Sequence, residues 1–455
     1  MPDIVGLQAL ITEAQTLYAD TTQGAAIFLA AITEAQSFLT SESSADVTKA
    51  KTTLSQAITA FKLLNASSSQ PVDLTARLNN PGFDDNNATG WSGAGTVGYH
   101  SVEFYQKTFN MYQTLAGLPA GKYRLQVRGF ERPKNNDGGA AYRAGTETIY
   151  ATFYAKASSF PERNTAFPSL YKHRFTGNGQ LNNYVNTMAG AEIMFNNPDS
   201  AYYVTTLTDI YLTDGATLTV GAKSDFQQGG YWALFDDFKL YYEGQDYSGA
   251  ATMVLALVNQ AKVLAASHIQ TSAFTTLSNA IATGEQAAGA DSLILKDLAI
   301  ASQALTAAIE TGKTSEAAYT ALQSALTAAQ AALGEGIGAD SLQAAISRGQ
   351  ATYNNLEADL NSLATAATDL SKAVLAYRLA NATGTAPTVT TTSKYARGSS
   401  VAFLRGSFTG TGITERGICW STHPEPTVLD GRSTTRFGSS GYLFKVDGLQ
   451  PSTVY

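Results

Sequence analysis

The chain has 455 residues, more than one domain usually contains, so we expect several domains. Acidic residues outnumber basic ones by 37 to 30, the net charge is -7 and no run of Lys or Arg occurs, which argues against a nucleic-acid partner or an anionic membrane surface. The single cysteine, Cys419, excludes a disulfide framework. No apolar run reaches the ~18 residues of a membrane span, so none is predicted.

Residues 1–65 are rich in Ala, Leu, Gln and Thr and nearly free of Gly and Pro. Near the end of this segment, apolar residues recur every three or four positions, which places them on one face of a helix. This set is Val47, Ala50, Leu54, Ala57, Phe61 and Leu64. The pattern predicts a bundle of three short helices over residues 1–65.

Residues 66–246 have a different composition, rich in Gly, Asn, aromatic and β-branched residues. Period-two alternation, as in residues 123–127, is typical of strands with one buried face. Residues 131–200 contain few clear strands and are expected to form long loops. The segment is therefore predicted to be a β domain.

Residues 248–312 and 315–380 return to the Ala-rich helical composition, and each is predicted to form another three-helix bundle. Residues 31–36, 280–285 and 345–350 align with one another by eye. A helical unit of this kind that occurs three times is a repeat signature.

Residues 385–455 are strand-like again, with β-branched runs near residues 388–392 and 400–404. The predicted fold class is therefore a multidomain α and β protein. In it, a β-sandwich jelly roll lies between three-helix bundles and is followed by a partial immunoglobulin-like β-sandwich.

The helical segments resemble FIVAR-like three-helix modules, on the strength of their Ala/Leu periodicity and the Ala-Ile pairs at residues 31, 280 and 345. Such modules occur as tandem spacers in large bacterial surface proteins and secreted glycan-degrading enzymes. The resemblance implies a spacer role for these segments.

The β domain resembles a galactose-binding-like jelly roll of the carbohydrate-binding-module type. The resemblance rests on its opening segment at residues 79–84 with Gly90 and Trp91, and on its closing segment at residues 232–240. Residues 109–123 are similar to a version found in multidomain surface proteins of glycan-degrading bacteria. The resemblance implies non-catalytic binding of a polysaccharide or of the glycan of a glycoconjugate.

The last segment resembles a fibronectin type III domain, on the evidence of residues 417–422 and of Leu449, Pro451, Thr453 and Tyr455. In that family a Tyr at this corner hydrogen-bonds back to the chain. The resemblance leaves the final strands unaccounted for, so we expect the natural protein to continue beyond Tyr455.

The jelly-roll resemblance also implies a structural Ca²⁺ ion, held by Asp84 after the opening Phe and by Asp237 of the closing strand. Calcium takes oxygen ligands, and adjacent carboxylates repel one another without a cation. The alternative is that Asp84 caps a turn and Asp237 is merely solvated. In an alternating strand only one of Asp236 and Asp237 can face Asp84.

Sugar recognition combines an aromatic ring against the pyranose with amides and charged groups on its hydroxyls. The loops of the β domain supply both kinds of side chain. The predicted ligand residues are Trp91, Tyr142, Arg143, Tyr171 and Tyr184. Trp91 is equally well explained as a core residue.

No catalytic signature occurs: there is no His-Glu-x-x-His, no Gly-x-Ser-x-Gly and no Walker A loop. We therefore predict a non-catalytic carbohydrate-binding and spacer region of a larger extracellular or cell-surface bacterial protein. An adhesin or pure spacer, binding host or matrix protein through its helical repeats, is the alternative. An enzyme without a linear motif is the third. The start of the chain lacks signal-peptide features, so we expect an export signal to lie outside this sequence.

Overall fold

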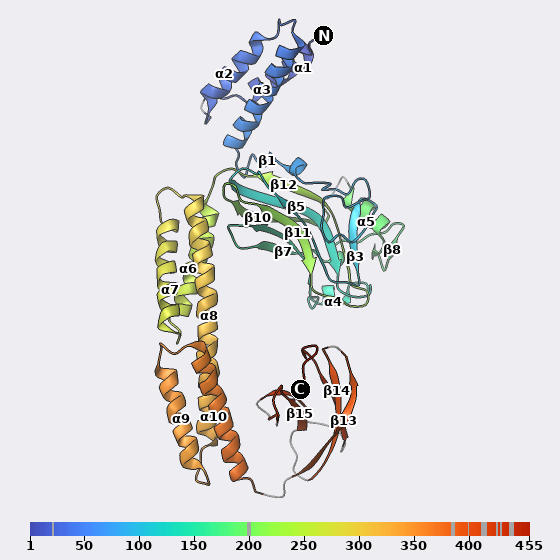
Figure 1. Ribbon diagram of the computed structural model, residues 1–455. Helices are drawn as coiled ribbons and strands as arrows, with labels where there is room; N and C mark the ends of the chain where they lie inside the picture. The colour runs from blue at the N-terminus through green and yellow to red at the C-terminus, as the bar shows by residue number, and fades with distance from the viewer. Residues whose placement is uncertain are drawn as a thin grey trace. The chain divides into compact units, whose positions relative to one another are not determined.

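The computed structural model in Figure 1 describes residues 1–20, 22–197, 202–383, 387–398, 400–410, 416–424, 426–427, 430–435 and 441–455. Helices come first, then antiparallel sheets, then more helices and a smaller β region, which confirms the predicted mixture of α and β. Two compact units result. One comprises Met1–Ala261 with Asn279–Ala307, and the other comprises Lys262–Ser278 with Ala308–Tyr455.

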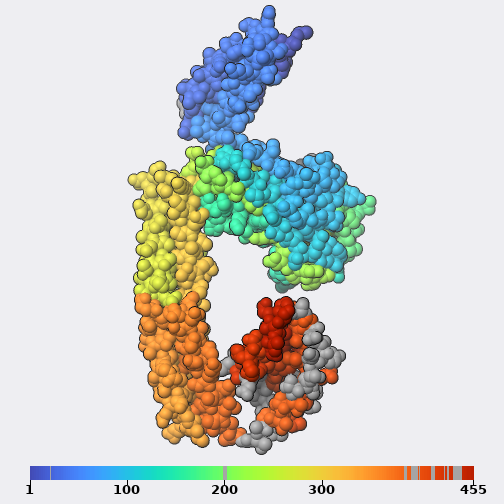
Figure 2. Space-filling model, viewed as in Figure 1, coloured from blue at the N-terminus to red at the C-terminus, as the bar shows by residue number. Residues whose placement is uncertain are grey.

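The N-terminal segment forms a three-helix bundle. Its helices are α1 (Ile4–Leu17), α2 (Ala25–Ser37) and α3 (Ser44–Leu64). Asp3 and Ser43 cap α1 and α3, because their side chains accept the free N–H groups of Gly6 and Asp46. The buried residues form one core: Leu7, Ile11, Ala14, Phe28, Ile32, Ala35, Val47, Ala50, Leu54, Ile58 and Phe61. The helices pack without a visible gap in Figure 2.

Two large antiparallel sheets form the core of the β domain. Sheet A has the order β10-β5-β12-β3-β2, with β1 also paired to β12. Its strands are β1 (Val72–Asp73), β2 (Thr96–Gly98), β3 (Ser101–Tyr105), β5 (Gly121–Arg132), β10 (Val204–Leu212) and β12 (Trp232–Tyr242). Sheet B has the order β4-β11-β6-β7. Its strands are β4 (Phe109–Leu115), β6 (Thr152–Ala157), β7 (Arg163–Ala166) and β11 (Leu218–Ser224).

Aromatic rings from the inner faces of the two sheets pack against each other. Phe104 of sheet A stacks on Phe109 of sheet B with ring centroids 4.0 Å apart. Phe235 of sheet A lies 5.9 Å from Phe153 of sheet B. The alternation of buried and exposed residues along β4 follows from this packing, since one face of each strand meets the core. The domain is a β-sandwich.

A second apolar cluster lies on the outer face of sheet A. Phe130, Trp232 and Leu234 on that face are buried beneath a covering segment. The covering elements are the 3-10 turn η2 (Leu170–Lys172), the strands β8 (Gln180–Leu181) and β9 (Tyr184–Val185), and the helix α5 (Met188–Phe195). The loops expected over residues 131–200 therefore carry short elements, although residues 198–200 lie outside the described part.

The helical repeats contain five helices. They are α6 (Ser248–Ala265), α7 (Thr271–Ala288), α8 (Leu295–Ala332), α9 (Ala339–Asn354) and α10 (Leu360–Ala380). The junction expected between residues 312 and 315 lies inside α8, which runs on because residues 306–318 contain no proline. Gly312 permits close packing there, since a Cβ would come within 2.5 Å of Leu264.

The sequence alignment makes Gly284 and Gly349 equivalent, and the structure gives them equivalent surroundings. A Cβ at Gly284 would come within 2.6 Å of Val258 and 2.8 Å of Leu305. At Gly349 it would come within 2.7 Å of Leu370. Both glycines therefore mark a point where helices approach too closely for a side chain.

Among the described residues, α6 is the one helix long and apolar enough to cross a membrane, judged by length and composition alone. One such helix is weak evidence, because a core helix of a bundle meets the same criterion. The buried residues of α6 include Ala250, Val254, Val258 and Ala261.

The C-terminal β region has two small antiparallel sheets. Its strands are β13 (Thr388–Arg397), β14 (Ala402–Thr409), β15 (Arg416–Trp420), β16 (Gly431–Thr435) and β17 (Gly441–Val446). The Tyr455 hydroxyl accepts the Gln450 backbone N–H at 3.0 Å, a contact back to the chain of the kind that the predicted corner requires. Residue 385, the predicted start of this domain, lies outside the described residues.

Candidate functional site

Trp91 lies in the sandwich core. It is 7% exposed, and its ring lies 5.7 Å from Phe83 and 4.6 Å from Phe238. The indole N–H donates to the Asn80 carbonyl oxygen at 3.1 Å. Its ring faces are therefore taken by protein neighbours, which leaves no free surface for stacking a sugar.

Tyr171 and Tyr184 are buried in the cluster over sheet A, at 4% and 3% exposure. Their rings meet edge to face with centroids 5.0 Å apart, and Arg174 lies 5.3 Å from the Tyr184 ring. The Tyr171 hydroxyl is buried, and within the described part of the chain no acceptor lies in reach of its proton. Burial raises the pKa of Tyr171 to about 12, so its hydroxyl stays protonated as a donor. Neither ring has a face open to a sugar.

Tyr142 and Arg143 lie on the short helix α4 (Ala140–Arg143). Tyr142 is 38% exposed, and Arg143 donates to the Gly138 carbonyl oxygen. Asp137 holds the start of this helix, because its carboxylate accepts the N–H groups of Gly139 at 2.9 Å and Ala140 at 3.2 Å. Of the five predicted ligand residues, these two remain open to solvent.

At one end of sheet A, Tyr105, Trp232 and Arg132 form a row across three strands. Trp232 of β12 is directly opposite Tyr105 of β3 and Arg132 of β5. Residues opposite each other in antiparallel strands share a face, so all three side chains lie on the outer face of the sheet. Tyr105 is 48% exposed, whereas Trp232 and Arg132 are nearly buried.

Arg132 is held by neutral partners. Its Nε donates to the Gly230 carbonyl oxygen at 3.1 Å, and its Nη1 donates to the Asn186 side-chain oxygen. The guanidinium also lies 5.2 Å from the Trp232 ring centroid. Burial lowers the pKa of Arg132 from its ordinary value, because the charged form is poorly solvated.

Close contacts and hydrogen bonds connect the loops that surround Arg132. Gly230, at φ +79°, lies so close to Asn135 that a Cβ would come within 2.2 Å of the Asn135 nitrogen. Asn136 donates to the Leu181 carbonyl oxygen at 3.1 Å, and Asn182 donates to the Asn136 carbonyl oxygen at 3.2 Å.

The tip of the β8–β9 hairpin carries positive φ at both Asn182 and Asn183, as a tight two-residue hairpin turn requires. These contacts connect the loops around Arg132 within the folded chain. We call Tyr105, Arg132, Asn135, Tyr171 and Asn186 the loop-end site.

The acid beside Arg132 in sequence faces the other way. Glu131 is fully buried on the inner face of β5, and its carboxylate accepts the backbone N–H groups of Tyr150 at 3.1 Å and of Ala151. Burial raises the pKa of Glu131 to about 7, although these hydrogen bonds oppose the shift. It supports the loop at residues 150–151 and does not pair with Arg132.

The outer face of sheet B carries a second aromatic row. Tyr112, Gly221 and Tyr154 are directly opposite one another across β4, β11 and β6. Tyr112 is 36% exposed, but Tyr154 is buried beneath Lys223, whose Nζ lies 4.6 Å from its ring centroid. Lys223 in turn pairs with Glu162 at 2.6 Å, so this charge has its own counter-ion.

The predicted metal residues lie near the β-bulge in β12 between Asp236 and Lys239. Asp237, at φ 52°, is 3.2 Å from the Lys239 Nζ and 3.8 Å from the Arg128 Nη2, so it has two cationic partners. Asp84 is exposed. Asp236 is the acid whose pKa responds to the charge of Asp84. Burial raises the pKa of Asp236 to about 8, and the charges of Asp237 and Asp84 add to the shift.

Carboxylate oxygens are the donors that Ca²⁺ prefers, so the chemistry of these acids fits that ion. Within the described parts of the chain, no group of three acidic, His or Cys side chains is already arranged to hold a metal. A calcium site here therefore requires Asp84 and the acids of the bulge to turn toward a common ion.

Sequence reasoning did not select Tyr105, Arg132 or Asn186 as ligand residues. The alternation along β5 could have placed Arg132 on the outer face, opposite to the core-facing Tyr123, Leu125 and Val127. No local pattern, however, shows that its neighbours are neutral. That property depends on Gly230 and Asn186, which are distant in sequence.

Among solved structures, TmCBM61 in complex with beta-1,4-galactotriose is similar over 37% of this chain and 98% of that chain, with 17% sequence identity and a TM-score of 0.22. A structure of CBM51-2 in complex with GlcNAc and INT domains from Clostridium perfringens ZmpB is similar over 50% of this chain and 44% of that chain, with 13% identity and a TM-score of 0.16. No protein-family profile matches the sequence. No curated protein matches it either. Residue roles are therefore argued from the site itself.

Proposed function

We propose that the β domain binds a glycan at the loop-end site. The observation that carries this proposal is the exposed Tyr105 ring, which shares a sheet face with the Arg132 guanidinium at the end of a sandwich with pinned loops. An aromatic ring beside fixed polar groups is what a sugar requires, because its C–H face is apolar and its hydroxyls need partners. Tyr142 and Arg143 on α4 are the flanking candidates.

The proposed binding is non-catalytic. The nearest acid in sequence, Glu131, faces the core with its oxygens taken by backbone N–H groups. Asp137 is paired with Lys134 at 3.0 Å and accepts the backbone N–H groups of Gly139 and Ala140. Cleavage of a glycosidic bond commonly needs two carboxyl groups that flank it, and these two acids are committed to structural roles.

The helical repeats are proposed to act as FIVAR-like spacers in an extracellular or cell-surface bacterial protein. The 38-residue helix α8 supports this role, since at about 1.5 Å per residue it spans roughly 57 Å without a break. The small C-terminal β region is proposed to be of the fibronectin type III kind.

The decisive experiment is affinity electrophoresis of the full chain in gels containing single polysaccharides. The panel includes β-1,4-galactan, polygalacturonate and glycans with GlcNAc. Tyr105→Ala is expected to weaken retardation by about 10-fold or more, as loss of a central aromatic anchor usually does. Tyr112→Ala is the matched control, because Tyr112 is also a half-exposed strand Tyr but lies on sheet B.

Retardation that survives Tyr105→Ala and is lost in Tyr112→Ala would move the site to sheet B. No retardation by any polysaccharide would overturn glycan binding and favour the adhesin hypothesis, in which the helical repeats bind a protein. Pull-down with matrix proteins would then follow.

We also propose that a structural Ca²⁺ ion binds at the β12 bulge through Asp84 and Asp237, with Asp236 as an added ligand. The raised pKa of Asp236 supports this, because a bound cation would relieve the burial of its charged form. The test is the melting temperature in EDTA, given below.

A further inference from the structure

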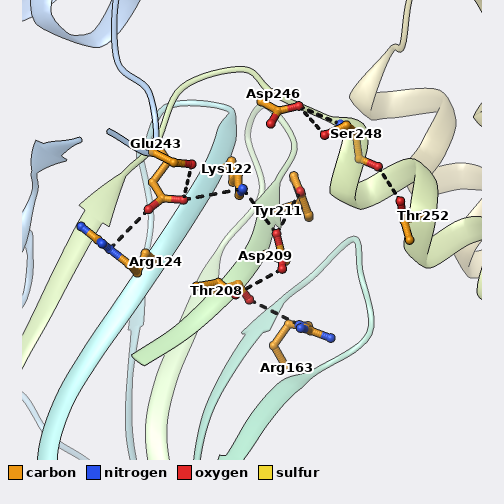
Figure 3. Close-up of polar contacts among 11 residues, drawn as sticks. Lys122, Arg124, Arg163, Thr208, Asp209, Tyr211, Glu243, Asp246, Ser248 and Thr252 are labelled. Carbon is orange, nitrogen blue, oxygen red and sulfur yellow. Dashed lines mark hydrogen bonds and ion pairs between the residues drawn. The ribbon is translucent and has the colours of Figure 1, made fainter. Parts of the chain in front are cut away.

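Four cationic side chains lie on the outer face of β5: Lys122, Arg124, Arg128 and Arg132. Three of them have an acidic partner. Figure 3 shows Lys122 beside Asp209 and Arg124 beside Glu243, at 3.4 Å and 3.3 Å. Arg128 lies 3.8 Å from Asp237.

Arg132 differs from its three neighbours. Within the described residues, no carboxylate lies at ion-pair distance from it, and its hydrogen bonds go to the neutral oxygens of Gly230 and Asn186. It is also closely covered, at 6% exposure. Burying a charge without a counter-ion is costly, so such a group normally has an acid beside it.

The side chains around Arg132 lead to the same conclusion. The Tyr171 hydroxyl is buried, and its proton has no acceptor among the described residues. Tyr105 and Arg132 lie opposite Trp232 on the two neighbouring strands, and Tyr171 packs in the same buried cluster as Trp232. The remaining N–H groups of Arg132 and this O–H are all donors, and no acceptor for them lies among the described residues.

We infer that the loop-end site takes a sugar that carries a carboxylate, with Arg132 as its counter-ion. A guanidinium matches a carboxylate with two parallel N–H···O bonds, a geometry that a neutral hydroxyl cannot use. The Tyr171 hydroxyl is the additional donor, and the exposed Tyr105 ring is the platform. This inference rests on the proposed glycan binding and names its ligand class. The carboxylate comes from a uronic acid within a polysaccharide or from a sialic acid at the end of a glycan.

The test compares polygalacturonate with the same polymer fully methyl-esterified, using the full chain. Sialyllactose is a third arm, which separates a terminal acid from an internal one. Affinity is measured by calorimetry, and a ligand-dependent change in Trp fluorescence that is lost in Trp232→Phe reports occupancy, because the Trp232 ring lies 5.2 Å from the guanidinium. We expect at least one acidic ligand to bind about 30-fold more tightly than the ester, because loss of one partner of a buried charge pair usually costs that much or more.

Arg132→Gln is expected to remove this preference. Arg128→Gln is the matched control and should change affinity less than about 3-fold, since Arg128 already has Asp237. Arg132→Lys keeps the charge but loses the planar fork, and is expected to retain part of the preference. The ester comparison uses the unmodified chain, so it decides the question even where Arg132→Gln does not fold.

The outcomes separate the two proposals. The carboxylate inference would be overturned if the chain bound polygalacturonate and its methyl ester with equal affinity and Arg132→Lys changed neither affinity. Glycan binding would remain in place. Failure to bind any acidic or neutral glycan would overturn both.

Discussion

The two outer faces of the β-sandwich each expose a tyrosine, but they differ in how the charges on them are balanced. On sheet B, Lys223 lies over the Tyr154 ring and has Glu162 as its counter-ion. On sheet A, Arg132 lies across Trp232 from Tyr105, and its hydrogen bonds go to neutral oxygens. Exposed aromatics alone would not distinguish these faces. The buried charge of Arg132, which has no acidic partner among the described residues, does distinguish them. Such a charge destabilises the fold, so we expect it to serve ligand binding.

The largest expected effect comes from a substitution in the core that both sheets share. Phe235 is fully buried between the sheets and contacts Phe104, Phe109 and Phe153. Phe235→Ala should reduce the free energy of unfolding of the β domain by about 3–5 kcal/mol, since it leaves a large cavity. Urea denaturation followed by Trp fluorescence measures this loss. A loss below about 1 kcal/mol would contradict a core shared by both sheets.

The next effect concerns calcium at the β12 bulge. A ligand that binds only the native state at about 100 times its dissociation constant adds roughly 2.7 kcal/mol. EDTA should therefore lower the melting temperature of the chain by several degrees, and CaCl₂ should restore it. In Asp236→Asn both responses should shrink. An unchanged melting temperature would mean that Lys239 and Arg128 alone neutralise Asp237.

The next effect concerns Glu131, which lies on the inner face of β5 next to Arg132 in sequence. Burial raises the pKa of Glu131 to about 7, so the folded state holds a proton more strongly than the unfolded state. Its contribution to stability is thus fully present below about pH 4.5, and is lost as the pH rises through about 7. The Gln side chain of Glu131→Gln cannot ionise. In this variant the free energy of unfolding should therefore fall by about 2–3 kcal/mol less as the pH rises.

Thermal unfolding of the chain and of Glu131→Gln at pH 5 and pH 8 measures this difference. Glu162→Gln is a suitable control, because Glu162 is partly exposed and paired with Lys223. A parallel decline of the chain and Glu131→Gln with pH would show that Glu131 titrates normally.

The smallest expected effect is on sheet B. Lys223→Met removes the partly exposed pair with Glu162 and should cost less than about 1 kcal/mol, as surface ion pairs usually do. Glycan affinity should not change. A clear loss of affinity, measured in the same gels, would place the ligand on sheet B and reverse the comparison between the two faces.

Sequence patterns were sufficient for the fold class because periodicity and composition are local. The helical face containing Val47, Leu54 and Phe61 is buried as predicted. The equivalence of Gly284 and Gly349 likewise follows from an alignment of neighbouring residues, and both occupy close helix contacts. The uninterrupted course of α8 was not predicted, because the repeats were expected to be separate units that meet between residues 312 and 315, whereas Gly312 packs against Leu264 inside one helix.

The candidate site was harder to predict because its properties arise from distant residues. Trp91 follows a glycine and reads equally well as a surface residue, but Phe238, far along the chain, covers its ring. Tyr171 is buried against Tyr184 for the same kind of reason. Arg132 is notable only through the absence of an acidic neighbour, and a sequence does not show which side chains will be close.

The most direct test of glycan binding at the loop-end site is hydrogen–deuterium exchange of the full chain with and without a polysaccharide that retards it. We expect new protection at the ends of β3 and β5 near Tyr105 and Arg132, and in the β8–β9 hairpin. The residues around Tyr112 and Tyr154 on sheet B should exchange as before. Protection confined to sheet B, or to the helices α6–α10, would contradict the proposed site.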